Sequence, residues 1–162
     1  MKTKFFSILL MLLSASLVPA VNASKNIRFE HLTTTDGLSH MSITDLLQDA
    51  QGFMWFATQE GLNRFDGYSI TTFEHDYRNA NSLADDWVWS LALDADNNIW
   101  VGTNNGGLNY FDQKTGSFTN WKHRADDPQS LSSNDVRVLL VDSQGSLWLG
   151  THEGGLSRKL PD

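Results

Sequence analysis

Hydrophobic and polar residues alternate in short bursts along most of the chain, and no window keeps the 3.6-residue period of an amphipathic helix. Runs rich in Val, Ile, Leu and aromatic residues are separated by turns rich in Gly, Asn and Asp, a pattern typical of β-strands. The predicted strands are residues 43–49, 54–58, 62–65, 70–73, 88–94, 99–103, 108–111, 118–121, 136–142 and 147–151, with a further outer strand at 27–32. The chain is therefore predicted to be all-β.

The strands recur in three copies, each marked by a tryptophan. Trp55, Trp100 and Trp148 lie 45 and 48 residues apart. Each copy also repeats an aspartate six residues before the tryptophan and a threonine three residues after it: Asp49, Asp94 and Asp142, and Thr58, Thr103 and Thr151. We interpret these residues as a structural framework, in which the aspartates bind turn amides, the threonines support the next turn and the tryptophans form the core.

Four antiparallel strands in a unit of about 45 residues are typical of a β-propeller blade. The sequence predicts about three blades: blade 1 at 38–80, blade 2 at 81–128 and an incomplete blade 3 at 129–162. Residues 27–37 are expected to supply the outer strand of a closing blade. Because a propeller needs four to eight blades to close, we expect an incomplete ring. An open β-solenoid is the alternative fold.

The first 23 residues have the composition of a secretory signal. Lys2 and Lys4 precede 14 mostly apolar residues at 5–18, and Ala20 and Ala23 are small residues of the kind a signal peptidase cuts after. The apolar stretch is too short to span about 30 Å of hydrocarbon comfortably. We predict export to the periplasm with cleavage after Ala23 or Ala20; an uncleaved anchor is the alternative.

Composition narrows the function classes. The 162 residues include no cysteine, 12 Lys and Arg, and 19 Asp and Glu, for a net charge of −7. The lack of cysteine excludes a disulfide scaffold, Cys-ligated zinc and a cysteine nucleophile. The negative charge argues against a nucleic-acid partner, because it repels phosphate. The histidines share no metal-ligand spacing, and residues 94–105 depart from a calcium loop at Ile99 and Asn105, so neither a metal nor a cofactor is predicted.

The repeat pattern is most complete in the third copy, residues 131–156. This copy contains the sequence Leu-x-x-Asp-x-x-Gly-x-Leu-Trp-x-Gly-Thr-x-x-Gly-Gly-Leu. This pattern resembles the two-component regulator propeller repeat. The first copy has Ala57 in place of a Gly, and the second has Asn97 in place of the turn Gly. The resemblance implies an N-terminal fragment of the periplasmic sensor region of a hybrid histidine kinase or diguanylate cyclase. It also implies rings of seven blades, and oligosaccharide ligands for members that sense glycans.

Two sets of loops are expected at one end of the blades if the first strand of each blade is innermost. One set precedes the first strand and the other joins the second strand to the third. Both sets vary between copies, and variation on a constant scaffold is where a ligand site is expected. The candidate ligand-binding residues are His40, Gln59, Glu60, Asp85, Asp86, Trp87, Asn104, Asn105, Asn134, Asp135, His152 and Glu153. Carboxylates and amides suit sugar hydroxyls, and Trp87 suits the apolar face of a sugar.

The sequence therefore predicts a ligand-sensing module with no catalytic residue in this chain. The expected partners are a small ligand such as an oligosaccharide, the remaining blades and membrane-linked output domains of a parent receptor, and a second copy in the full-length protein. Two alternatives stay open. One is an exported lyase or glycosidase using Asp85, Asp86, His152 and Glu153, and the other is a propeller that assembles protein partners.

Overall fold

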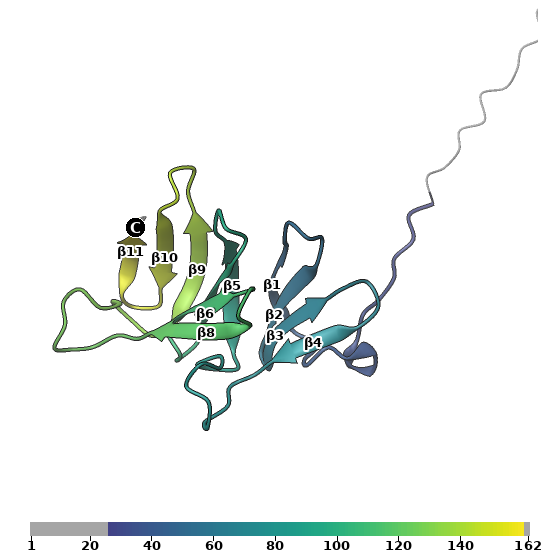
Figure 1. Cartoon of the computed structure of the whole chain (residues 1–162), viewed down its shortest axis with the longest axis horizontal. Helices are drawn as coiled ribbons and strands as arrows, with labels where there is room; N and C mark the ends of the chain where they lie inside the picture. The colour runs from purple at the N-terminus through teal and green to yellow at the C-terminus, as the bar shows by residue number, and fades with distance from the viewer. Residues whose placement is uncertain (1–25, 161–162) are drawn as a thin grey trace, which may run out of the picture. The chain divides into compact units, whose positions relative to one another are not determined.

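The computed structural model describes residues 26–160 (Figure 1). The predicted signal sequence, residues 1–23 with its cleavage sites at Ala20 and Ala23, lies outside the described residues. Residues 26–30 and residues 31–160 belong to separate compact units. Within residues 26–160 there is no helix with the length and apolar character needed to cross a membrane.

Residues 31–160 form three antiparallel sheets after one short 3₁₀ turn, η1 (Thr34–Asp36). Blade 1 consists of β1 (Ile43–Gln48), β2 (Met54–Thr58), β3 (Gly61–Phe65) and β4 (Ile70–Phe73). Blade 2 consists of β5 (Val88–Leu93), β6 (Ile99–Thr103), β7 (Leu108–Asp112) and β8 (Ser117–Trp121). Blade 3 consists of β9 (Val136–Val141), β10 (Leu147–Thr151) and β11 (Gly155–Lys159). Each blade is a simple meander, as Figure 1 shows.

The prediction of an all-β chain with about three propeller blades in an incomplete ring is confirmed for the described residues. Residues 27–32, predicted as an outer strand, adopt no regular structure in the described part of the chain. A strand exists only through its ladder with a neighbour, and the sheets among the described residues hold no strand paired to this segment. Its assignment to a closing blade stays a prediction.

The turn between the first two strands of each blade is closed by the framework aspartate. In blade 1, the Asp49 carboxylate accepts hydrogen bonds from the amides of Gln51 and Phe53, both at 3.0 Å, and from the Trp55 indole at 2.8 Å. Asp142 makes the equivalent three bonds in blade 3. The positive φ predicted in this turn is present at Gly52, Asn97 and Gly145. The framework interpretation of the aspartates is therefore confirmed.

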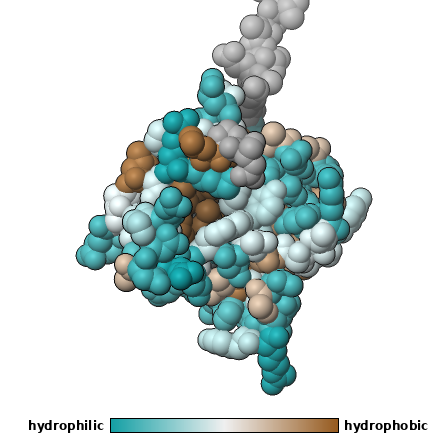
Figure 2. Space-filling view, turned by 60° about the vertical axis from the view of Figure 1, so that its left-hand side comes forward, coloured by the Kyte–Doolittle hydropathy of each residue, from teal (hydrophilic) through white to brown (hydrophobic). Residues whose placement is uncertain are grey.

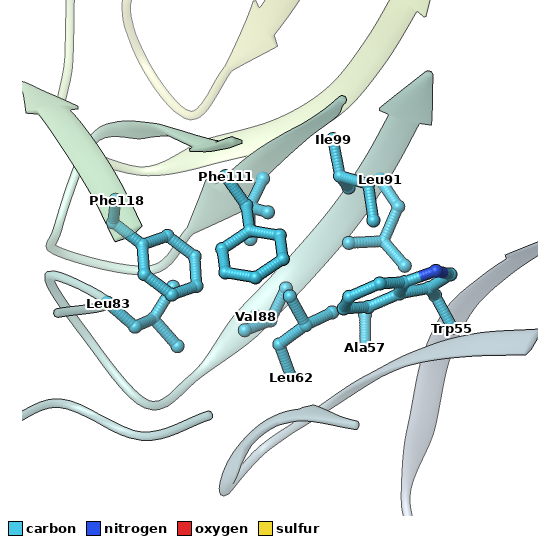
Figure 3. Packing of buried hydrophobic residues seen from close by; sticks show 10 residues of the cluster. Trp55, Ala57, Leu62, Leu83, Val88, Leu91, Ile99, Phe111 and Phe118 are labelled. Carbon is cyan, nitrogen blue, oxygen red and sulfur yellow. The ribbon is translucent and has the colours of Figure 1, made fainter. Parts of the chain in front are cut away.

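Neighbouring blades pack face to face, and the core lies between them. Figure 3 shows Trp55 of blade 1 against Val88, Leu91 and Phe111 of blade 2. The Trp55 ring is 0% exposed and lies 5.5 Å from the Phe111 ring. A second cluster joins blades 2 and 3 around Trp100. Trp148 of blade 3, whose outward face has no blade upon it, is only half-buried.

The first strand of every blade contains the same irregularity. The pairing between first and second strands slips between Ile43 and Asp45, between Val88 and Ser90, and next to Val136 in blade 3. A bulge of this kind leaves one residue unpaired and re-aims its side chain. The bulged residues are Thr44, Trp89 and Arg137. Because first strands of neighbouring blades contact one another, these three residues lie at equivalent places on the inner edge.

Candidate functional site

The two sets of variable loops lie at the same end of the blades, as the sequence predicted. Pairing of Val88 with Thr103, and of Val136 with Thr151, puts the start of each first strand beside the end of each second strand. The loops also bond directly. In blade 2 the amide of Asn104 donates to the carbonyl of Trp87 at 2.9 Å.

The loops of neighbouring blades are joined as well. The amide of Gly61 in blade 1 donates to the carbonyl of Asp86 in blade 2 at 2.6 Å. The amide of Gly107 in blade 2 donates to the carbonyl of Asn134 in blade 3 at 3.0 Å. The candidate residues of blades 2 and 3 therefore belong to one continuous rim rather than to separate loops.

Several candidate side chains hold the rim together. The Asp85 carboxylate accepts from the amides of Trp87 at 3.1 Å and of Asn105 at 2.6 Å. Asp86 accepts from the amide of His75 at 2.6 Å. Asn134 accepts from the amide of the equivalent histidine, His123, at 2.7 Å. These acceptors are engaged by the backbone, so less of their capacity remains for a ligand than the sequence suggested.

The candidates of blade 1 and the loop tips are less constrained. His40 accepts from the amide of Ser42 through Nδ1 at 3.0 Å, and Gln59 is half-buried. The side chains of Glu60, Asn105, His152 and Glu153 are exposed. The structure therefore divides the candidates into rim-holding residues and outward-facing ones.

The most organised part of the rim is a group that we call the tryptophan–arginine cluster: Trp87, Trp89, Asn104, Asp135, Arg137 and His152. The rings of Trp87 and Trp89 lie 5.1 Å apart, and both side chains are half-buried. The Trp89 indole donates to the Asn104 side-chain oxygen at 3.3 Å. The Trp87 indole nitrogen is buried without a hydrogen-bond partner among residues 26–160.

Arg137 brings blade 3 into this cluster. Its guanidinium carbon lies 4.3 Å from the centre of the Trp89 ring, a cation–π contact across the blade boundary. Nε and one terminal nitrogen donate to the two oxygens of Asp135, at 2.7 and 2.8 Å. The Asp135 carboxylate raises the pKa of Arg137 above its ordinary value through these bonds. His152 Nδ1 lies 3.6 Å from the same carboxylate.

Sequence reasoning missed Trp89 and Arg137, because both lie inside segments read as ordinary strand. The available signal was their place in the repeat. Thr44, Trp89 and Arg137 are equivalent positions that differ in size and charge, although the position before each one stays aliphatic. The bulge, which depends on strand pairing and cannot be read from the local sequence, turns these variable side chains toward the rim.

The framework residues have structural roles. The hydroxyl of Thr58 donates to the carbonyl of Gly61 at 2.8 Å. In blade 2, the hydroxyl of Thr103 donates to the carbonyl of Gly107 at 2.9 Å. The ring nitrogens of the repeated histidines His75 and His123 lie 2.6 Å from backbone oxygens. No group of three or more metal-ligating side chains gathers within the described part of the chain.

Two hollows among the described residues lie away from the rim. One, of about 540 Å³, is lined by Trp121, Leu131 and Arg158 beside β8 and β11. We call it the outer groove. Another, of about 430 Å³, is lined by Trp100, Tyr110 and Lys159. Neither hollow includes a residue of the tryptophan–arginine cluster.

Comparison with known proteins identifies the repeats. The family model described as "two component regulator propeller" matches residues 37–60, 82–105 and 130–153. A protein named Histidine kinase P4 from Formosa agariphila is 34% identical over 79 residues, which are 49% of this chain and 6% of that protein.

Two solved structures share both fold and sequence. The extracellular domain of a putative hybrid two-component system from B. thetaiotaomicron is 32% identical with a TM-score of 0.71, covering 79% of this chain and 19% of that one. A second such domain from the same organism is 27% identical with a TM-score of 0.60, covering 75% and 16%. This chain thus spans less than a fifth of each of these relatives. The chain belongs to the two-component regulator propeller family.

Proposed function

We propose that this propeller signalling module recognises a small ligand through the tryptophan–arginine cluster and passes the event to a two-component receptor. The observation that carries the proposal is the contact of Arg137 with Trp89 across the boundary between blades 2 and 3. A ligand bound there touches two blades at once. It can therefore favour one arrangement of the blades over another, which is what a sensor requires.

The chemistry of the cluster suits an oligosaccharide. Two tryptophan rings offer apolar faces on which a sugar ring stacks. Asn104 keeps its amide nitrogen, and Arg137 keeps one terminal nitrogen, without a hydrogen-bond partner among the described residues. Both groups are donors, and sugar hydroxyl oxygens accept hydrogen bonds. His152, exposed at the edge of the cluster, adds a further polar group.

The proposal also covers location. The signal-like composition of residues 1–23 and the extracellular placement of the relatives' domains support export to the periplasm. Kinase or cyclase output would then belong to membrane-linked domains of a parent receptor, outside these residues. The negative net charge supports a partner other than nucleic acid.

The enzymatic alternative draws no support from the rim. A glycosidase needs two carboxylates that face each other across the substrate. Asp85 and Asp86 are instead engaged by backbone amides, and Asp135 is engaged by Arg137. The relatives are sensor domains of signalling proteins, which supports recognition without catalysis.

The test is calorimetric titration of the exported chain with a panel of neutral and acidic oligosaccharides. We expect one class to bind, and Trp89→Ala to weaken that binding at least tenfold. Tyr68→Ala is the control, because Tyr68 is 97% exposed and lies outside the cluster. Binding that survives Trp89→Ala would move the site elsewhere. Release of shorter sugars would support the lyase or glycosidase, and absence of binding to every sugar would refute the oligosaccharide proposal.

A further inference from the structure

The turn between β6 and β7 contains Asn105 followed by Gly106, and the chain has no second Asn-Gly pair. In such a pair the backbone nitrogen of the glycine can attack the side-chain carbonyl carbon of the asparagine, because no Cβ stands beside the attacking nitrogen. Asparagine is one of the thermolabile residues of proteins. The fold decides whether the two groups are free to react.

The fold requires the glycine at this place. A Cβ on Gly106 would lie 2.6 Å from Thr103 Oγ1 and 2.8 Å from the Cβ of Asp85, so no other residue fits without a shift. Gly154, the equivalent residue in blade 3, is confined in the same way, because such a Cβ would lie 2.6 Å from Thr151 Oγ1. The glycine is therefore part of the repeat framework, like the threonine that precedes it.

The residue before the glycine differs between the blades. Blade 2 has Asn105 at this place, whereas blade 3 has Glu153 and blade 1 has Glu60. A glutamate carries no amide nitrogen that could leave as ammonia. Of these three blades, blade 2 alone therefore joins the required glycine to a side chain that can react with it.

Both reacting groups are free of hydrogen bonds to the described part of the chain. Asn105 is exposed, and hydrophilic residues, drawn in teal, make up most of the face shown in Figure 2. The backbone amide of Asn105 donates to Asp85 at 2.6 Å, but its side chain has no partner among residues 26–160. The amide of Gly106 also lacks an acceptor there, although the next amide, that of Gly107, donates to the carbonyl of Asn134 at 3.0 Å. The attack therefore breaks no hydrogen bond between these residues.

We propose that Asn105 and Gly106 form a site of spontaneous covalent modification, at which the asparagine loses ammonia. The Gly106 nitrogen bonds to the side-chain carbonyl carbon of Asn105, and the bond from that carbon to the side-chain nitrogen breaks. This nitrogen leaves as ammonia with the proton of the Gly106 amide, and a cyclic imide remains. Water then opens the imide at either of its two carbonyl carbons. One product is an aspartate at position 105, and the other is an isoaspartate, in which the main chain continues through the side-chain carbon.

The two products act differently on the rim. An aspartate at position 105 places an acid where blades 1 and 3 already have one, so the turn keeps its shape. An isoaspartate lengthens the main chain by one carbon atom before Gly106, which moves the amide of Gly107 away from the carbonyl of Asn134. That hydrogen bond joins blade 2 to blade 3, and Asn104 of the tryptophan–arginine cluster directly precedes the altered residue. The isoaspartate therefore loosens the blade boundary at the rim.

The experiment is peptide mapping by mass spectrometry after incubation of the folded, exported chain in mildly alkaline buffer, with synthetic peptides as standards for the two products. We expect Asn105 to be converted at least tenfold faster than Asn104, the matched asparagine of the same turn, which no glycine follows. Asn105→Gln should slow the conversion at least tenfold, because the longer side chain must close a larger ring. Equal rates at Asn104 and Asn105 would overturn the proposal. Conversion that occurs only after unfolding in urea would also overturn it, because the folded turn would then block the attack.

Hydrogen exchange at the Gly107 amide tests the effect on the blade boundary. The chain that carries isoaspartate at position 105 should exchange this amide at least tenfold faster than the unmodified chain. Asn105→Asp is the matched control, because it adds the same charge without lengthening the main chain, and it should leave the exchange unchanged. Equal exchange in the isoaspartate form and the unmodified chain would refute the loosening of the boundary. Neither measurement uses a ligand, so both are independent of the proposed function.

Discussion

Replacing Asp49 by alanine removes the acceptor of three hydrogen bonds in a place that water barely reaches. Asp49 is 5% exposed, and Trp55, whose indole donates to the Asp49 carboxylate, is 0% exposed. After the substitution, the amide of Gln51 can donate to water instead, but the buried indole N–H of Trp55 cannot. An unsatisfied buried donor costs about 1–3 kcal/mol, and the lost bonds to a charged acceptor add to this. We expect the free energy of unfolding to fall by about 3–4 kcal/mol.

Asp94→Ala is the matched control in blade 2. Asp94 accepts from the amides of Asp96 and Asn98, at 2.9 and 2.8 Å, as its equivalent in blade 1 does. Its third donor is the hydroxyl of Tyr110 at 2.7 Å, which keeps a bond from the Asn98 side chain and is only half-buried. Burial and the Asp94 carboxylate together raise the pKa of Tyr110 to about 12. Because this donor can be rehydrated, we expect a loss of about 1–2 kcal/mol.

Urea unfolding followed by circular dichroism measures both losses, and a double-mutant cycle isolates the buried donor. Trp55→Phe removes the indole N–H, so it should cost less in the Asp49→Ala background than in the wild type. The expected coupling is about 1–2 kcal/mol. Equal losses for Asp49→Ala and Asp94→Ala, or strictly additive effects of Asp49→Ala and Trp55→Phe, would refute the reasoning that the stranded indole sets the cost.

Three further predictions use the same unfolding measurement. A Cβ on Gly102 would lie 2.7 Å from the Val136 carbonyl oxygen of the next blade, so Gly102→Ala should lower the free energy of unfolding by about 3 kcal/mol. The control is Gly116→Ala, which should lower it by about 1 kcal/mol because nothing lies within 4 Å of a Cβ at that position. Similar losses would contradict the close approach. The buried Ser90 hydroxyl has no partner among the described residues, so Ser90→Ala should leave stability unchanged or raise it by about 1 kcal/mol; a clear loss would reveal a bond. Bonds from the Trp148 indole and from turn amides hold the pKa of Asp142 below its ordinary value. Its contribution to stability should therefore be full at neutral pH and decline as the pH falls through the acid range, and Asp142→Asn should make that decline shallower.

The blades were predictable because the turns between their strands are formed by residues whose structural role depends only on the local sequence. Asp49 and Gly52 define a turn on their own, through a carboxylate that binds amides and a residue that accepts positive φ. The strand predicted at 27–32 depends on information of the opposite kind. Its alternating apolar residues are compatible with a strand, but a strand also needs a partner, which lies outside the local sequence.

The sequence predicted that the two variable loop sets share one end of the blades, and the strand pairing confirms that shared end. The sequence could not predict which polar side chains there the fold itself would use. Asp85 and Asn134 look like ligand contacts in the sequence, yet their oxygens bind backbone amides. Trp89 and Arg137 look like strand residues, yet a bulge brings them into contact. Both outcomes depend on contacts between distant segments.

The same bulge links the rim to the core. Arg137, which touches Trp89, directly follows Val136, which is fully buried between blades 2 and 3. A ligand that drew the guanidinium away from the tryptophan would therefore pull on a residue in the interface between two blades. Close-packed interfaces resist small continuous shifts and change instead between discrete arrangements. A ligand that left this contact unchanged would bind both arrangements equally and would carry no signal, however tightly it bound.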